Sequence, residues 1–453
     1  MNQTPLMQQY REIKARHQSA ILFFRMGEFY EMFYEDAELA AHVLGLTLTS
    51  RNNGAAADVP LAGIPVKAAS EYLRRLVRQG YRVAICEQVE DPKLAKGVVR
   101  REVVETITPG VAFADDLLDG GRNNFICAVV VAGDATGIAA ADVSTGELRL
   151  STAAASDLEP QLARLAPREI LIAAGDASVR VPAERGSEGA LITERDAWEF
   201  DEASARDDLA RHFSVLSLEG LGLDAADSLA IAAAGALLRY LRELQPGGVK
   251  LGRPVVERPG GVMPLDEMTR RNLELIESLR GGPEGTLVGV LDRTQTPMGA
   301  RLLRQWMLAP LTDRIRIETR LDAVDALVRD AVGRQALLDG LRGVRDIERL
   351  ATKAAMGRST PRELGALGAS LGRLPGVHDA VSRLGQTGAL AEIISQWDSC
   401  DDVAGPLADG LVERPPAAIG DEATIAPGVD RELDELRALR DGGKDAIARI
   451  QTQ

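Results

Sequence analysis

The chain has 453 residues, 45% of them hydrophobic and 26% charged, a composition typical of globular proteins with material for about three domains. Its 53 Lys and Arg against 67 Asp and Glu give a formal net charge of −14, which excludes a uniformly basic nucleic-acid-binding protein but not one with a locally basic face. Three dispersed cysteines and four dispersed histidines exclude a disulfide scaffold and a Cys/His metal cluster, and they fit a reducing cytoplasm.

Residues 1–110 are predicted to be mixed α and β. Residues 21–24 have the apolar pattern of a buried strand, and this pattern ends at Gly27. Helices are expected over 33–44 and 70–79, and further strands over 46–51, 81–86 and 98–108, with a turn at Asn53 and Gly54.

A second α/β unit is expected over residues 120–245. Its predicted strands are 125–131, 137–143, 147–150 and 169–172, followed by a long apolar helix over 224–244. Ser156 and Glu159 form a capping-box pattern that predicts a helix start. Residues 245–264 hold four prolines and five glycines, a composition typical of a linker.

Beyond the linker, the sequence predicts an α-helical assembly. Thr360 and Glu363 form a capping box that opens a helix. Apolar positions continue at helical spacing to Ile450 without a stop signal, from which we expect a truncated sequence. Two helical faces are formed by Ile317, Leu321, Val324 and Val328, and by Leu364, Leu367 and Leu371.

Charge and aromatic residues both single out the N-terminal region. Residues 1–110 carry a net charge of +1 and residues 111–453 carry −15, so contact with a polyanion is expected near the N-terminus. Seven of the 17 aromatic residues lie between Tyr10 and Tyr34. No uncharged apolar run reaches the roughly 18 residues of a membrane span, so no membrane partner is expected.

Phe29 and Glu31 are the candidate binding residues within that aromatic segment. In an extended chain alternate side chains share a face, so these two would point the same way. The pattern alone favours an ordinary core phenylalanine for Phe29. The functional alternative is a ring that wedges between base steps, because unstacking is easiest at a mispair, while a neighbouring carboxylate accepts a hydrogen bond from the displaced base.

Basic residues near this segment are candidates for contacts with a DNA backbone. A solvated charged surface is the commoner explanation for any single one of them. The candidates are Arg51, Lys67, Lys93, Lys96, Arg100 and Arg101, with the densest group between Lys93 and Arg101.

Nucleotide-binding motifs are weak or missing. Residues 220–225 match GxGxxA, but no clear strand precedes them in a βαβ unit, so a plain helix start is expected. Gly442, Gly443 and Lys444 lack both the first glycine and the final Ser/Thr of a Walker A loop. We therefore expect no enzymatic site, no ATP site and no metal cofactor in this sequence.

Several long, gapless segments resemble one family. The N-terminal mismatch-binding domain of the MutS family of DNA mismatch repair proteins is similar to the segments RMGEFYEMFYEDAELAAHVLGLTLT, PLAGIPVKAASEYLRRLVRQGYRVAICEQVEDP and VVETITPGV. The start of that family's helical core domain is similar to RRNLELIESLRGG and TLVGVLDRTQTPMGARLLRQWMLAPL. Together the similar segments and the organisation between them cover most of the chain.

This resemblance implies a multidomain fold with α/β and all-α parts. A mixed α/β mismatch-binding domain is expected at 1–112 and a ribonuclease-H-like connector at 118–245. A linker at 246–264, an all-helical core and lever domain at 265–425, and the start of a clamp arm at 426–453 would follow.

The resemblance also implies roles and partners. The family's Phe-x-Glu motif falls on Phe29, which would stack on the mispaired base from the minor groove, and on Glu31, which would hydrogen-bond that base. The implied partners are mismatched double-stranded DNA, a MutL-type protein and, in a homodimer, a second copy. The family hydrolyses ATP with magnesium in a C-terminal domain that this sequence lacks, so an N-terminal fragment is expected, located in the cytoplasm with the nucleoid.

Two other functions stay open at this stage. The acidic region beyond residue 110 would suit a non-enzymatic protein-interaction module without DNA binding. A MutS relative that binds branched DNA is the second alternative, although the intact triplet Phe29-Tyr30-Glu31 argues against it, because branch binding needs no wedge.

Overall fold

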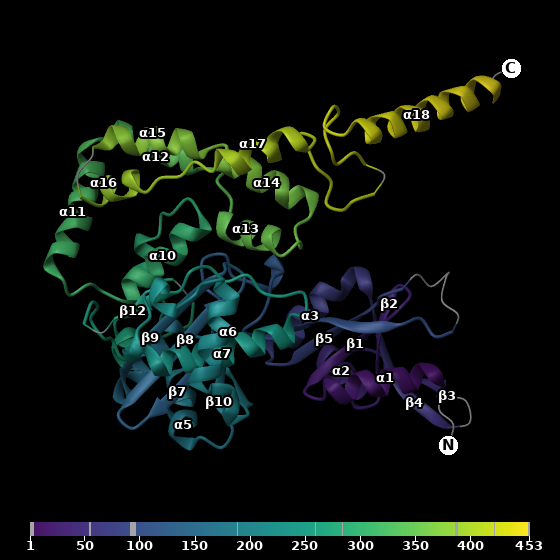
Figure 1. Cartoon of the computed structure of the whole chain (residues 1–453), viewed down its shortest axis with the longest axis horizontal. Helices are drawn as coiled ribbons and strands as arrows, with labels where there is room; N and C mark the ends of the chain where they lie inside the picture. Colours follow the sequence, from purple (N-terminus) through teal and green to yellow (C-terminus); the bar gives the residue numbers. More distant parts are fainter. Residues whose placement is uncertain are drawn as a thin grey trace. The chain divides into compact units, whose positions relative to one another are not determined.

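The computed structural model describes residues 4–53, 56–90, 97–187, 189–258, 260–282, 284–385, 388–420 and 422–451. The chain forms two compact units. The first contains Met1–Asp292 and Arg301–Thr312, and the second contains Arg293–Ala300 and Asp313–Gln453. Figure 1 shows the elements in chain order from purple to yellow.

A six-stranded mixed sheet begins the first unit (Figure 1). The strand order is β3-β4-β2-β1-β5-β6, in which β1 and β5 are parallel and the other neighbouring pairs are antiparallel. The helices of this domain are α1 (Pro5–Arg16), α2 (Glu35–Leu44) and α3 (Ala69–Arg78). The strands are β1 (Ala20–Met26), β2 (Phe29–Phe33), β3 (Thr49–Asn53), β4 (Ala56–Pro65), β5 (Arg82–Gln88) and β6 (Arg101–Ile107).

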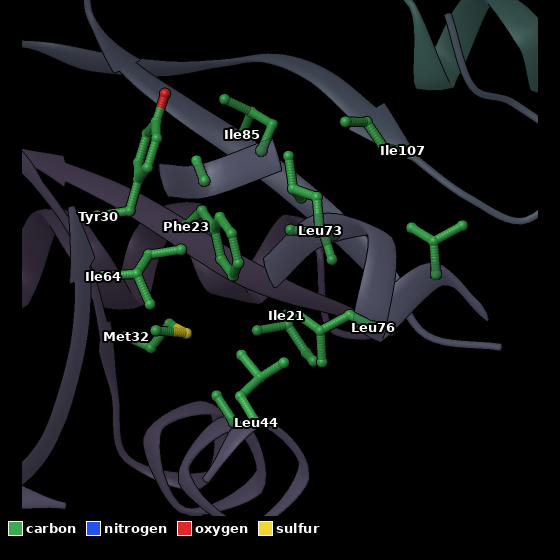
Figure 2. Close-up of a cluster of buried hydrophobic side chains, with 14 of the residues drawn as sticks. Ile21, Phe23, Tyr30, Met32, Leu44, Ile64, Leu73, Leu76, Ile85 and Ile107 are labelled. Atoms are coloured by element: carbon green, nitrogen blue, oxygen red, sulfur yellow. The ribbon is translucent and has the colours of Figure 1, made fainter. Parts of the chain in front are cut away.

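This first sheet has a hydrophobic core on each face. Phe23, Tyr30 and Met32 belong to the core that α2 and α3 cover (Figure 2). Phe24 and Phe33 belong to the opposite core and meet the ring of Tyr10 from α1 edge to face. Because both faces are buried, the central strands are apolar at consecutive positions, which explains the uninterrupted run at 21–24.

A second six-stranded sheet follows in the same unit, in the order β11-β10-β7-β8-β9-β12. Strands β7, β8 and β9 are antiparallel, and β10 and β11 extend the sheet in parallel beyond β7. This arrangement of the first five strands is the ribonuclease-H-like order expected for the connector. The strands are β7 (Ile126–Ala132), β8 (Ala135–Asp142), β9 (Glu147–Ala154), β10 (Glu169–Ala173), β11 (Leu191–Arg195) and β12 (Val255–Glu257).

Helix α7 (Ser228–Leu244) packs directly on this second sheet. A Cβ at Gly137 of β8 would lie 2.2 Å from the backbone of Leu229, so only glycine permits this approach. The other helices of this domain are α4 (Leu158–Leu165), α5 (Ala177–Gly186) and α6 (Glu202–Phe213). Short 3₁₀ turns complete the unit: η1 (Val66–Ala68), η2 (Asp115–Leu117), η3 (Ala155–Asp157), η4 (Ala197–Phe200), η5 (Leu218–Leu221) and η6 (Ala225–Asp227).

The later part of the chain is helical. Two buried clusters hold the second unit together, one formed by α13, α14 and α17 and the other by α11, α12, α15 and α16. Helices α8 (Glu267–Asn272) and α9 (Leu287–Leu291) belong to the first unit, and α10 (Pro297–Leu308) has residues in both units. The helices of the second unit are α11 (Arg314–Arg329), α12 (Ala331–Leu341), α13 (Ile347–Ala355), α14 (Pro361–Leu371), α15 (Leu374–Leu384), α16 (Gly388–Ser395), α17 (Asp401–Gly410) and α18 (Arg431–Gln451).

Three local expectations need correction. The helix expected from residue 33 begins at Glu35, because Phe33 ends β2 and Tyr34 has a φ of +53°. The Ser156/Glu159 capping box does not form, since α4 begins at Leu158 without a side-chain cap bond. The stretch expected to be a linker contributes β12, which pairs in parallel with β9.

Two other helix starts are confirmed. The Thr360/Glu363 capping box opens α14, with both of its reciprocal hydrogen bonds formed. Residues 220–225 lead into η6 and α7, where Asp224 and Asp227 form a capping box. An acidic pair at this helix start is unfavourable for a phosphate, so the GxGxxA match marks a helix start only.

Candidate nucleic-acid interface

A tight hairpin presents Phe29 at the edge of the first domain. Gly27 and Glu28 form the two-residue turn between β1 and β2, and Gly27 adopts a φ of +60° that glycine tolerates without strain. The N–H of Val66 donates to the carbonyl of Glu28 at 2.9 Å, which fixes the turn to the end of β4. Phe29 is 48% exposed and belongs to neither core.

Alternation along β2 separates the functional candidates from the residue that anchors them. Phe29 and Glu31 lie on one face of the strand, while Tyr30 and Met32 enter the core drawn in Figure 2. The Tyr30 hydroxyl is directed away from that cluster and donates to Glu87 of β5. Burial and then this hydrogen bond raise the pKa of Tyr30, so the hydroxyl remains a donor.

Glu31 forms an ion pair with Arg51 of β3. The Arg51 Nη1 atom lies 2.6 Å from Glu31 Oε2, and the two side chains are 35% and 20% exposed, respectively. The Arg51 guanidinium carbon is also 6.0 Å from the centre of the Phe33 ring, within cation–π range. The structure therefore brings together Phe29, Glu31 and Arg51 on one side of the sheet.

Arg101 occupies an internal position rather than the surface expected for a backbone contact. It is only 6% exposed, and its Nε donates to the carbonyl of Arg25 at 2.7 Å. Its Nη1 donates to the carbonyl of Val99 at 2.8 Å, and the guanidinium lies 4.9 Å from the centre of the Phe24 ring. The guanidinium therefore supports the base of the hairpin from within the fold, and its buried position does not fit the backbone contact expected for Arg101.

The remaining basic candidates are distributed around the domain. Lys67 is exposed in η1, directly after the end of β4. Arg100 is exposed beside β6 and forms an ion pair with Glu102 at 2.5 Å. Lys93 and Lys96 lie outside the described residues.

A buried polar network joins the first domain to the second within the same unit. Glu169 of β10 is fully buried and accepts hydrogen bonds from Thr108, Thr193 and Tyr240. Arg82 of β5 lies 3.6 Å from Glu169 and donates to Thr193 at 2.5 Å. The sheet that carries Phe29 is therefore held to the second sheet by a shared carboxylate.

Sequence reasoning missed the residues that position the candidates. The roles of Tyr30 and Glu87, the Glu31–Arg51 pair and the Glu169 network all depend on strands that are distant in sequence. The one available signal was alternation, which places Tyr30 opposite Phe29 once the segment is known to be a strand.

Within the described ranges, no three His, Cys, Asp or Glu side chains are grouped as a metal site. None of the helices in the described part of the chain has the length and apolar character needed to cross a bilayer.

Comparison with known families matches almost the whole chain. Family models described as MutS domain I, MutS domain II and MutS domain III match residues 4–116, 124–252 and 268–452, respectively. The chain belongs to the MutS family and corresponds to its domains I to III.

Individual relatives agree with this assignment. The DNA mismatch repair protein MutS of Salinibacter ruber is 42% identical over 457 residues, covering 99% of this chain and 50% of that protein. Those of Solibacter usitatus and Cereibacter sphaeroides are each 42% identical over 99% of this chain, covering 52% and 51% of their own lengths. The chain thus spans about half the length of these curated relatives.

Proposed function

We propose that this chain recognises mispaired or unpaired bases in duplex DNA as part of DNA mismatch repair. Phe29 stacks on the mispaired base from the minor-groove side, and Glu31 accepts a hydrogen bond from that base. The observation that carries the proposal is the half-exposed phenylalanine at the end of a tight hairpin, with a carboxylate on the same face of its strand.

The energetics of stacking favour a defect over a matched pair. Unstacking a base step costs a few kcal/mol, and less where pairing has already failed. Stacking of a base on an aromatic ring returns about 1–3 kcal/mol. Stacking on the ring therefore offsets more of the free-energy cost of unstacking at a mispair than at a matched pair. This difference lets the protein discriminate mispaired from matched DNA without reading the base sequence.

The hairpin also supplies the rigidity that a wedge needs. A ring can unstack bases only if its backbone does not yield, and β2 is paired on both sides, by β1 and β4. Tyr30 anchors the same strand, because its ring packs in the core and its hydroxyl donates a hydrogen bond to Glu87. Phe29 thus lies at the start of a strand that is paired along both of its edges.

The backbone contacts in this proposal rest on the charges of basic residues, and its remaining parts rest on family membership. Lys67, Arg100, Lys93 and Lys96 are proposed as backbone contacts. ATP with magnesium, a MutL-type partner, a homodimer and a location with the nucleoid in the cytoplasm are proposed for the full-length protein.

The direct test is binding of the full-length protein to G·T heteroduplex and to matched homoduplex. For Phe29→Ala we expect the ratio of the two affinities to fall about tenfold, the size of one lost base–aromatic stack. Trp198→Ala, which removes an exposed aromatic ring from η4 of the second domain, is the matched control and leaves the ratio unchanged. Equal discrimination by wild type and Phe29→Ala would refute the wedge.

A protein-interaction module without DNA binding is the second candidate, favoured by the net charge of −15 beyond residue 110. The same binding assay carried out with the 453-residue chain separates the two, because the truncated module predicts no DNA complex with any duplex. Including a four-way junction tests the branched-DNA alternative, which predicts tighter binding to the junction than to the G·T mispair.

A further inference from the structure

We infer that Arg51 is a positioning residue for Glu31 and thereby sets how strongly a mispair is preferred over matched DNA. This inference rests on the proposed function of Phe29 and Glu31. It assigns to Arg51 a task different from the plain backbone contact expected from its charge.

The ion pair spans a strand. In the order β3-β4-β2, Arg51 and Glu31 are separated by β4, so they are not neighbours in the sheet. Their partners on β4 are Val59 for Arg51 and Gly63 for Glu31. Residues paired across strands point to the same face, so the two long side chains meet above β4.

Gly63 of β4 and Phe33 of β2 lie beside this ion pair. A Cβ built at Gly63 would lie 3.9 Å from Cγ of Glu31, which is an ordinary van der Waals contact, so Gly63 packs beside the carboxylate side chain. Phe33, on the same face of β2, supports the guanidinium from its ring at 6.0 Å. The Phe33 ring therefore supports the pair in addition to the charges themselves.

The contact with Arg51 gives the two carboxylate oxygens of Glu31 different roles. Arg51 donates to Oε2, whereas Oε1 accepts no hydrogen bond from the residues that the structure describes. A hydrogen bond from a base requires one acceptor oxygen, which Oε1 supplies while Oε2 is held. Arg51 fixes the direction of Oε1 in this way and offsets a negative charge that DNA phosphates would otherwise repel.

Two kinds of effect distinguish positioning from backbone contact. An arginine that only touches a phosphate strengthens binding to every duplex alike and does not depend on Glu31. An arginine that acts through Glu31 changes the preference for the mispair, and its effect disappears when Glu31 no longer carries a charge. A double-mutant cycle measures this dependence.

The experiment measures affinity for G·T heteroduplex and homoduplex with full-length wild type, Arg51→Gln, Glu31→Gln and the double variant. We expect Arg51→Gln to lower the ratio of heteroduplex affinity to homoduplex affinity about fivefold. This factor corresponds to the free energy that a partly exposed ion pair contributes. In the Glu31→Gln background the same change leaves the ratio unaltered. Arg51→Lys restores most of the ratio, because the observed contact uses a single nitrogen.

Lys67→Gln is the matched control, since it removes an exposed cation of the same domain without touching Glu31. It lowers both affinities by the same factor. An Arg51→Gln variant that behaves like Lys67→Gln, or that has the same effect with and without Glu31, overturns the positioning role. If Phe29→Ala also leaves discrimination intact, the proposed function fails as well, so the two failures are distinguishable.

Discussion

Replacing Glu169 by glutamine tests the buried network that joins the two sheet domains of the first unit. Its carboxylate accepts hydroxyl hydrogen bonds at 2.5 Å from Thr108 and at 2.7 Å from both Thr193 and Tyr240. Burial and the neighbouring Glu169 charge raise the pKa of Tyr240, so its hydroxyl stays protonated and donates. The chain also passes so close that a Cβ at Gly110 would lie 2.8 Å from Cβ of Glu169, so only glycine fits at this position.

The expected loss of stability in Glu169→Gln follows from the interactions that an amide cannot replace. Glutamine removes the charge that attracts Arg82 and turns one acceptor oxygen into a donor. A hydrogen bond to a charged group is worth about 1.5–3 kcal/mol against about 1 kcal/mol for a neutral one, so weakening three such bonds and losing the charge costs about 3 kcal/mol.

Hydrogen exchange of the β10 amides in the intact protein measures this effect locally. We expect these amides to exchange about a hundredfold faster in Glu169→Gln. Glu184→Gln is the control, because Glu184 pairs with Arg180 on the exposed face of α5 and its loss leaves β10 unchanged. Equal protection of β10 in both variants would refute the idea that Glu169 holds the two domains together.

Two further predictions concern Tyr30 and Glu257. Tyr30→Phe keeps the ring in the core but loses the bond to Glu87, so urea unfolding is expected to show a loss of about 1 kcal/mol, whereas an unchanged midpoint would contradict the anchoring role. Burial alone would raise the pKa of Glu257, but ion pairs with Arg164 and Arg149 outweigh it and lower the pKa below 4.5. Since the folded pKa is depressed, the stability that separates wild type from Glu257→Gln should be fully present above pH 4.5 and decline as the pH falls further, and a pH-independent difference would rule this out.

Sequence patterns predicted those elements whose signals are local. Strand β1, helices α3 and α7, and the capping box of α14 follow from apolar runs, periodicity and cap residues within a few positions. Strand β4 was missed because its prolines, alanines and glycine give it little strand propensity. Strand β12 was missed because it has only three residues and lies in a stretch rich in proline and glycine. Strand β4 forms because it pairs with β2 and β3, and strand β12 forms because it pairs with β9.

The candidate site shows the same division. Alternation was enough to predict that Phe29 and Glu31 share a face. The exposure of Phe29 depends on whether the core that contains Tyr10, Phe24 and Phe33 extends as far as this ring, which the sequence does not reveal. The Glu31–Arg51 contact requires the register of three strands at once. Arg101 misled the sequence reading because its charge predicts a surface position, whereas backbone carbonyls satisfy it within the fold.

The entry of the Phe29 ring into the base stack can be observed directly. A fluorescent adenine analogue, whose emission rises when stacking is lost, is placed beside a G·T mispair or in matched duplex and saturated with full-length protein. We predict a rise with wild type and with Trp198→Ala on the mispaired duplex only, and no rise with Phe29→Ala. The same rise with Phe29→Ala at saturation would contradict the proposal that this ring unstacks the mispair.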